Sequence, residues 1–205
     1  MAQHGRVVLP VFMPMAGAAA VQPLARFAAV ARLGHAQALV DPDGVTRRYL
    51  AQETDGQSAY DHLALVLQDL AAGRVATPRP RAPLERLVPF AGPAGHITRV
   101  AFSDVRDGLV APERLRGKTV LIGATATGLG DTVVTPLAGV NGAMPGVEFV
   151  ANVLDAEQRG LSRQTVSVPT QMLAGVAIVG LYLLSLLPVA VGLVVVIGRR
   201  RLRTG

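Results

Sequence analysis

Residues 118–124 read KTVLIGA, and they form the clearest strand pattern in the chain. After Thr119 the run is continuously apolar, with no alternation of polar and apolar positions. A strand of this kind must be covered on both faces, as the strands of parallel sheets are. The run therefore predicts a central, parallel strand in an α/β domain.

A helix is predicted downstream of this strand. A long loop, residues 125–144, leads to Pro145, a residue type favoured at helix starts. Apolar residues then follow at the spacing of one helical face: Val147, Val150, Ala151 and Leu154. Gly160 stands where a C-terminal cap belongs, so the helix is expected to end there.

Residues 6–13 (RVVLPVFM) allow two interpretations. The apolar, β-branched run is typical of a strand. It also resembles the apolar part of a signal peptide, with small residues at 16–18 as a cleavage site. Pro10 and Pro14 break helices, and a signal peptide needs a helix there, so the strand is favoured.

Further elements are predicted in the first half of the chain. Residues 34–40 and 45–51 flank the turn sequence DPDG at 41–44, which predicts a hairpin. Ser58 and Asp61 resemble a capping box, and the apolar spacing that follows predicts a helix over residues 59–72, ended by Gly73.

The middle of the chain completes the predicted fold. Residues 74–83 (RVATPRPRAP) suit a solvated, extended connection, and residues 84–90 and 96–102 are predicted strands. The fold class is therefore α/β, with a mixed sheet that has a central parallel strand and flanking helices. A transmembrane helix is expected to follow this domain.

The C-terminal part predicts that membrane helix. Residues 164–198 carry no charge, and the apolar run 172–197 would extend about 39 Å as a helix, against a bilayer core of about 30 Å. Pro188 interrupts the run, but the apolar residues after it are too few for a second span, so one tilted or kinked span is expected. The predicted organisation is an extracytoplasmic domain over 1–162, a transmembrane helix over 168–198 and a basic cytoplasmic tail over 199–205.

The charge distribution sets the expected topology and excludes nucleic-acid binding. The net charge is +6, yet four arginines lie in the tail, and without them 16 basic residues face 14 acidic ones. A phosphate-binding surface needs concentrated positive charge with stacking aromatics, and aromatics are 4% of the chain. The arginines after the span predict a single-pass protein with the N-terminal domain outside the cytoplasm and the C-terminus in the cytoplasm.

The search for catalytic motifs predicts that the chain is not an enzyme. It contains no cysteine, no Gly-x-Ser-x-Gly and no Ser-x-x-Lys. Its four histidines lack metal-ligand spacing and are expected at surface or capping positions, so no metal is predicted. The glycine-rich turn at 123–131 lacks the Lys-Ser/Thr of a P-loop and does not pass into a helix, so no nucleotide or other cofactor is predicted.

A ligand site is nevertheless predicted beyond the carboxyl end of the 118–124 strand, where loops diverge and helix N-termini point inward. The candidate binding residues are Thr125, Thr127, Asp131 and Thr135 from the loop, with Glu148 and Asn152 from the helix. The last two are four positions apart and share one helical face. Local capping explains Asp131 and Glu148 equally well, because a carboxylate is favoured near a helix N-terminus.

The order of short motifs resembles a known family, the type-2 CHASE domain (cyclase/histidine-kinase-associated sensory extracellular domain). The longest match is residues 115–131. Shorter matches in the same order are Gly34-His35, residues 41–45, Arg47-Arg48, Ser103–Val105, Asp107-Gly108, Thr135-Pro136, Met144–Glu148, Ala151-Asn152 and Leu154-Asp155. The resemblance covers roughly residues 5–160.

The resemblance implies a signal-input module of a bacterial transmembrane receptor, located in the inner membrane with its N-terminal domain periplasmic or extracellular. Its ligand would be an unknown small molecule or envelope signal, and the lipid bilayer would be a partner. Its output kinase or cyclase domain would be encoded separately or lost. Two departures are Val150, where the family often has histidine, and the absence before Arg6 of the membrane helix, strand and helix with which the family domain opens; the chain is therefore expected to be truncated.

Other possibilities stay open on the sequence alone. The chain could be a membrane-tethered α/β protein that binds a ligand or nucleotide, or an inactive truncated gene product. The sequence also leaves a homodimer open. It does not identify the ligand or the output activity.

Overall fold

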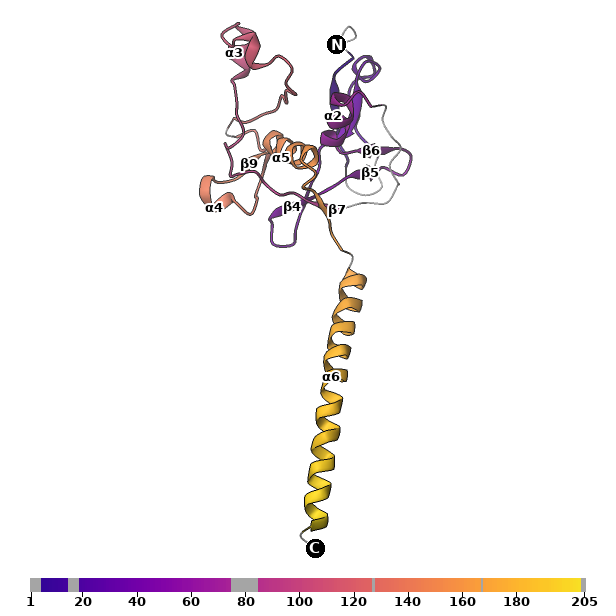
Figure 1. Ribbon diagram of the computed structural model, residues 1–205. Coiled ribbons are helices and arrows are strands. Elements are labelled where there is room, and N and C mark those ends of the chain that lie inside the picture. Colours follow the sequence, from indigo (N-terminus) through magenta and orange to yellow (C-terminus); the bar gives the residue numbers. More distant parts are fainter. Residues whose placement is uncertain (1–4, 15–18, 75–84, 127, 167, 204–205) are drawn as a thin grey trace. The chain divides into compact units, whose positions relative to one another are not determined.

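A computed structural model describes residues 5–14, 19–74, 85–126, 128–166 and 168–203. The chain forms two compact units, Met1–Thr165 and Val166–Gly205. The first contains every strand that the structure describes, and the second is a single long helix (Figure 1). The predicted connection at residues 75–83 and Thr127 lie outside the described residues.

The first unit begins with a parallel pair of strands. β1 (Val8–Val11) pairs with β2 (Arg32–His35), and α1 (Ala25–Ala28) lies between them in the chain. The strand interpretation of residues 6–13 is therefore confirmed. The side chains of Val11 and Met13 are buried against Tyr60.

A four-stranded antiparallel sheet follows, in the order β10-β7-β4-β3. Its strands are β3 (Ala38–Val40), β4 (Thr46–Leu50), β7 (Glu85–Leu87) and β10 (Arg163–Gln164). The predicted hairpin is β3–β4: Gly44 has a φ of +80° and donates its N–H to the carbonyl of Asp41 at 2.8 Å. Positive φ is the conformation that glycine adopts at low cost.

Two helices form the centre of the unit. α2 (Leu63–Ala71) packs against α5 (Gly146–Gln158), as Figure 1 shows. The main apolar cluster includes Ala64 of α2, Phe149 and Val153 of α5, and Tyr49 of β4. The helix predicted between Pro145 and Gly160 is confirmed, and Gly160 has a φ of +65°.

The predicted start of α2 at residue 59 is wrong. Residues Ala59–Asp61 form strand β6, which pairs with β5 (Gln52–Thr54). Tyr60 faces inward from this hairpin and is 8% exposed, and that burial favours a strand over the first helical turn. The helix begins after His62, whose side chain accepts the N–H of Ala64.

The predicted central strand at 118–124 is not formed among the described residues. Thr119–Thr125 make no backbone hydrogen bond to another described segment, and Val120 and Ile122 are 50% and 78% exposed. Only Leu121 packs against the main apolar cluster. The sequence pattern predicts covered faces and paired edges, and no described strand pairs with this segment. Among the described strands, β1 and β2 are paired in parallel.

The predicted strand at 96–102 is also wrong. This stretch has no strand pairing and leads into the short helix α3 (Phe102–Arg106), followed by the 3-10 turn η1 (Pro112–Arg114). The N–H groups of Gly95 and Ile97 donate to the side chain of Glu148, so they are not available for pairing with a strand. The loop after residue 125 contains β8 (Thr132–Val133), α4 (Ala138–Asn141) and β9 (Met144–Pro145).

The second unit is α6 (Val168–Arg203), with Pro188 inside it. The stretch Pro169–Leu186 is long and apolar enough to cross a membrane. It is the single such helix among the described residues. The helix continues to Arg203, five residues beyond the predicted end at 198.

Candidate functional site

Among the predicted loop residues, Asp131 lies at the start of α5. Thr135 follows Val134, whose carbonyl accepts an N–H of β4. The carboxylate of Asp131 lies so close to Gly146, the first residue of α5, that a Cβ at this position would overlap it. Negative charge is favoured at a helix N-terminus. Thr135 is buried, and its Oγ1 accepts the N–H of Leu137 at 3.3 Å. Thr125 is exposed, and Thr127 lies outside the described residues.

The two predicted helix residues are buried and bind the loop at 91–97. The oxygens of Glu148 accept the N–H of Gly95 at 2.8 and 3.0 Å, and Oε1 also accepts that of Ile97 at 3.3 Å. Asn152 accepts the N–H of Ala91 at 3.0 Å and donates to the carbonyl of Glu148 at 2.9 Å. The two candidate residues on α5 therefore bind the loop at 91–97, which is not the loop that contains Asp131 and Thr135. Their side chains already have backbone partners.

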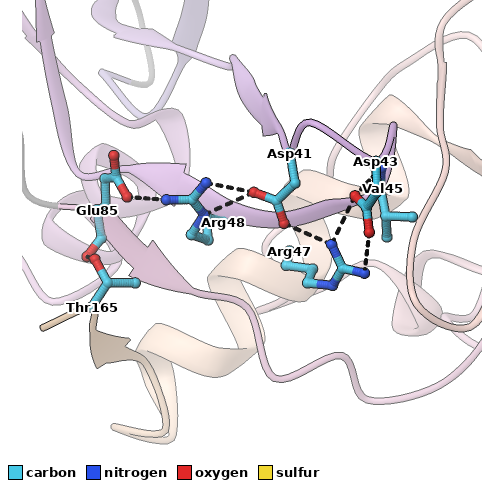
Figure 2. A network of polar contacts seen from close by, with 7 residues as sticks. All are labelled: Asp41, Asp43, Val45, Arg47, Arg48, Glu85 and Thr165. Atoms are coloured by element: carbon cyan, nitrogen blue, oxygen red, sulfur yellow. Dashed lines mark hydrogen bonds and ion pairs between the residues drawn. The ribbon is translucent and has the colours of Figure 1, made fainter. Parts of the chain in front are cut away.

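The described residues form an open hollow elsewhere, at the β3–β4 hairpin. It has a volume of about 440 Å³ and is lined by Asp41, Pro42, Asp43, Arg47, Arg48 and Leu87. Its charged side chains are joined in a continuous network (Figure 2). Arg47 bridges Asp41 and Asp43 at 2.8 and 2.7 Å, while Arg48 contacts Asp41 at 2.5 Å and also pairs with Glu85.

Mutual neutralisation dominates the electrostatics of this hollow. Hydrogen bonds from Arg47 and Arg48 lower the pKa of Asp41, and those from Arg47 and the Val45 N–H lower the pKa of Asp43 to about 2. The same contacts raise the pKa of both arginines. Three carboxylates face two guanidiniums, so no positive charge is left over for an anionic ligand. The network fixes the hairpin to β7, and it contains no nucleophile paired with a base.

A second polar cluster joins this sheet to α5. The hydroxyl of Tyr49 in β4 donates to Glu157 of α5, which also accepts from Arg86 of β7 at 2.7 Å. Burial and the bond to Glu157 raise the pKa of Tyr49. Burial opposes ionisation of Glu157, but the bonds from Tyr49 and Arg86 outweigh it and lower its pKa. The cluster therefore holds three elements together through one ionised carboxylate.

The sheet is adjacent in sequence to α6. The edge strand β10 ends at Gln164, and α6 begins at Val168. The N–H of Thr165 still donates to the carbonyl of Glu85 in β7, at 3.2 Å. The sequence interpretation did not identify this connection, because two-residue strands such as β10 carry no periodic signal.

The polar side chains at these places hold parts of the chain together. Among the described residues, no group of three or more His, Cys, Asp or Glu side chains is placed to hold a metal ion. Each acidic side chain at these places accepts hydrogen bonds from the chain itself. Asp41 accepts from arginine, Glu157 from tyrosine and Glu148 from backbone N–H groups. Such arrangements position elements relative to one another.

Comparison with known proteins identifies the family. A family model named CHASE2 domain matches residues 1–187, which is most of the chain. No curated protein and no solved structure matches it significantly. The long motif at 115–131 and the shorter ordered motifs had indicated the same family. The chain therefore belongs to the CHASE2 family of extracellular sensory domains.

Proposed function

We propose that this chain is the extracytoplasmic signal-input part of a bacterial transmembrane receptor. Its output, a kinase or cyclase domain, lies outside the chain. The family supports a sensory role, and α6 supports attachment to a membrane. The arginines at 199–201 and 203 favour a single-pass arrangement in the inner membrane with a cytoplasmic C-terminus.

The observation that carries the proposal is the short connection between the folded unit and α6. β10 is hydrogen-bonded into the sheet, and three residues separate it from the helix. A rearrangement of β7 or β4 would therefore act directly on the chain entering α6. Signalling needs an element of this kind, whose two arrangements are biased by the input.

The proposed input is a small molecule or envelope signal at the loop after residue 124. Thr125, Asp131 and Thr135 belong to this loop, and Glu148 and Asn152 belong to the helix beside it. The N–H of Thr46 in β4 donates to the carbonyl of Val134 at 2.7 Å. A ligand that moved this loop would thus act on the same sheet that contains β10.

The coupling can be tested with a receptor chimera in which a diguanylate cyclase is fused after Gly205. Thr165→Pro removes the N–H that bonds Glu85, whereas Thr165→Val keeps it and removes only the hydroxyl. We expect Thr165→Pro to change basal output several-fold and Thr165→Val to leave it near the wild-type level. Equal output from all three chimeras would contradict coupling through β10.

A further inference from the structure

Two fully buried histidines meet where β2 reaches the start of α2. His35 is the last residue of β2, His62 precedes α2, and both are 0% exposed. Their rings are in edge contact, with centroids 5.1 Å apart, and the backbones form a parallel bridge. Gly34 permits this approach, because a Cβ there would lie 2.9 Å from the Cα of Leu63.

The hydrogen bonding of His62 fixes its neutral state. Its Nδ1 accepts the N–H of Ala64 at 3.3 Å and so caps α2. The proton must then be on Nε2, which has no partner among the described residues. A second proton on Nδ1 would turn the acceptor into a donor that faces another donor. It would also place a cation at a helix N-terminus, where positive charge is disfavoured.

His35 has one carboxyl neighbour that could accept a hydrogen bond from its protonated form. Its Nδ1 is 3.8 Å from Oε2 of Glu53, and neither His35 nitrogen has a hydrogen-bond partner of good geometry within the described parts of the chain. Burial lowers the pKa of His35 to about 4, although the Leu50 carbonyl opposes this shift. Burial also raises the pKa of Glu53. Glu53 therefore faces a protonated His35 as a hydrogen-bond acceptor rather than as a full counter-charge.

The neighbouring titratable side chains of Tyr49 and Asp61 are hydrogen-bonded to other groups. The ring of Tyr49 from β4 lies 4.9 Å from that of His62, and its hydroxyl is bound to Glu157. The carboxylate of Asp61 in β6 accepts from Gln52 at 3.0 Å. Burial, and secondarily the neighbouring His35, lowers the pKa of His62 well below its usual value. Both imidazoles are thus neutral at pH 7.

We propose that His35 and His62 form a proton-operated switch at the start of α2. At neutral pH the uncharged pair packs together and His62 caps the helix. In acid, a proton from solvent binds Nδ1 of His35, and the charged ring moves away from His62 toward an oxygen of Glu53, which accepts its N–H. Loss of the ring contact displaces His62 and withdraws its cap from the N–H of Ala64. The switch concerns the conformation of this chain and does not depend on the proposed receptor function.

The position of the pair gives the switch a structural consequence. α2 packs against α5, and Gln68 of α2 donates to the carbonyl of Glu157 at 3.0 Å. Glu157 in turn binds Tyr49 and Arg86 of the sheet that contains β10. Release of the first turn of α2 would therefore weaken the contacts between α2 and α5, the helix whose Glu157 binds β4 and β7. In an extracytoplasmic domain, the pair would respond to external acidity.

The experiment is a pH titration of the full chain in detergent micelles, with labelled histidine observed by NMR. His35 should titrate near pH 4, and the amides of Ala64 and Leu65 should lose exchange protection over the same range. Titration of His35 near 6.5, the ordinary value of a solvated imidazole, or protection of α2 that persists through the His35 titration, would overturn the proposal.

Two variants and one further measurement sharpen the test. Glu53→Leu removes the acceptor oxygens and should move the His35 midpoint to lower pH, whereas an unchanged midpoint would remove Glu53 from the switch. His96→Gln is the matched control and should leave the His35 midpoint unchanged. Loss of protection in α5 at the same pH as in α2 would indicate global unfolding, and would overturn a local switch. The wild-type titration decides the main point even if a variant fails to fold.

Discussion

Both carboxylate oxygens of Glu148 accept the backbone N–H of Gly95, at 2.8 and 3.0 Å. The side chain is 4% exposed, so water cannot replace this partner. The carboxylate thus attaches the loop at 91–97 to the first turn of α5, and its charge is favoured by that helix end. This relationship gives Glu148 a structural role that would coexist with any ligand contact.

Glu148→Gln is therefore expected to destabilise the folded unit. The amide keeps one acceptor oxygen but brings an NH₂ donor toward backbone N–H groups, at a cost of about 1–3 kcal/mol for an unsatisfied buried group. Chemical denaturation of the full chain in micelles measures the difference. Glu113→Gln, at an exposed position, is the matched control and should be neutral. An unchanged stability of Glu148→Gln with lost output in the chimera would instead assign Glu148 to ligand binding.

Leu121 and Ile122 should respond very differently to the same substitution. Leu121 packs on the main apolar cluster, whereas Ile122 is 78% exposed. Leu121→Lys should cost about 2–4 kcal/mol, because a charge replaces a core contact. Ile122→Lys should change stability by less than about 0.5 kcal/mol. Equal destabilisation by both lysines would show that the segment is covered on both faces, as its sequence pattern predicts.

The difference between pattern and structure at this segment shows the limit of sequence interpretation. Local chemistry predicted the β3–β4 hairpin, the course of α5 and the apolar helix α6, because a DPDG turn, a helical spacing and a charge-free run each depend on nearby residues. The pairing of residues 118–124 depends on which strands lie beside them. No local pattern contains that information, so a continuous apolar run implied a central strand that the described residues do not form.

The candidate site was predictable only in part for the same reason. Helical spacing placed Glu148 and Asn152 on one face of α5, but not the loop whose N–H groups they accept. That loop, at 91–97, is more than 50 residues away in sequence from Glu148. The histidines were expected at surface or capping positions. His62 is a cap, whereas the full burial of His35 was missed, because a single histidine in a strand carries no periodic signal.

The depressed pKa of His35 predicts a specific dependence of stability on pH. The unfolded imidazole titrates near 6.5 and the folded one near 4, so the unfolded state binds more protons between these values. The contribution of neutral His35 to the free energy of unfolding is fully present above about pH 6.5. It falls as the pH is lowered, and it is lost below about pH 4. The largest loss of stability from this cause is about 3 kcal/mol.

His35→Gln tests this contribution, because glutamine is polar but does not titrate. At pH 7 the variant should be less stable than the wild type, since its amide would be buried with few partners. The gap, which is the difference in free energy of unfolding between wild type and variant, should narrow by about 2 kcal/mol between pH 6.5 and 4.5. Only the wild type is destabilised by charging of the imidazole. Urea titrations of the full chain at several pH values measure the gap. A gap that is constant with pH would contradict a buried, neutral His35.

Asp41 should matter more than Asp43 for the hairpin network. The Asp41 side chain is 12% exposed and binds both Arg47 and Arg48, whereas that of Asp43 is 54% exposed and binds Arg47 alone among the arginines. Solvent screens the exposed pair, so its net contribution is small. Asp41→Asn should lower the melting temperature by a few degrees, and Asp43→Asn by much less. The reverse order would show that the Asp43 carboxylate stabilises the hairpin mainly through the Val45 N–H, which it accepts at 3.1 Å.

The orientation of α6 can be predicted from the charges at its ends. Arg199, Arg200, Arg201 and Arg203 follow the apolar span, while Arg159 and Arg163 precede it. Positively charged residues near a span are retained on the cytoplasmic side, so the C-terminus should be cytoplasmic. Alkaline phosphatase, which becomes active only after export, should therefore be inactive when fused after Gly205. Replacing the four C-terminal arginines with glutamine removes the charge bias and should raise phosphatase activity, whereas replacing Arg159 and Arg163 should not. Full activity of the unmodified fusion would reverse the topology and place the folded unit in the cytoplasm, where it could not sense an external signal.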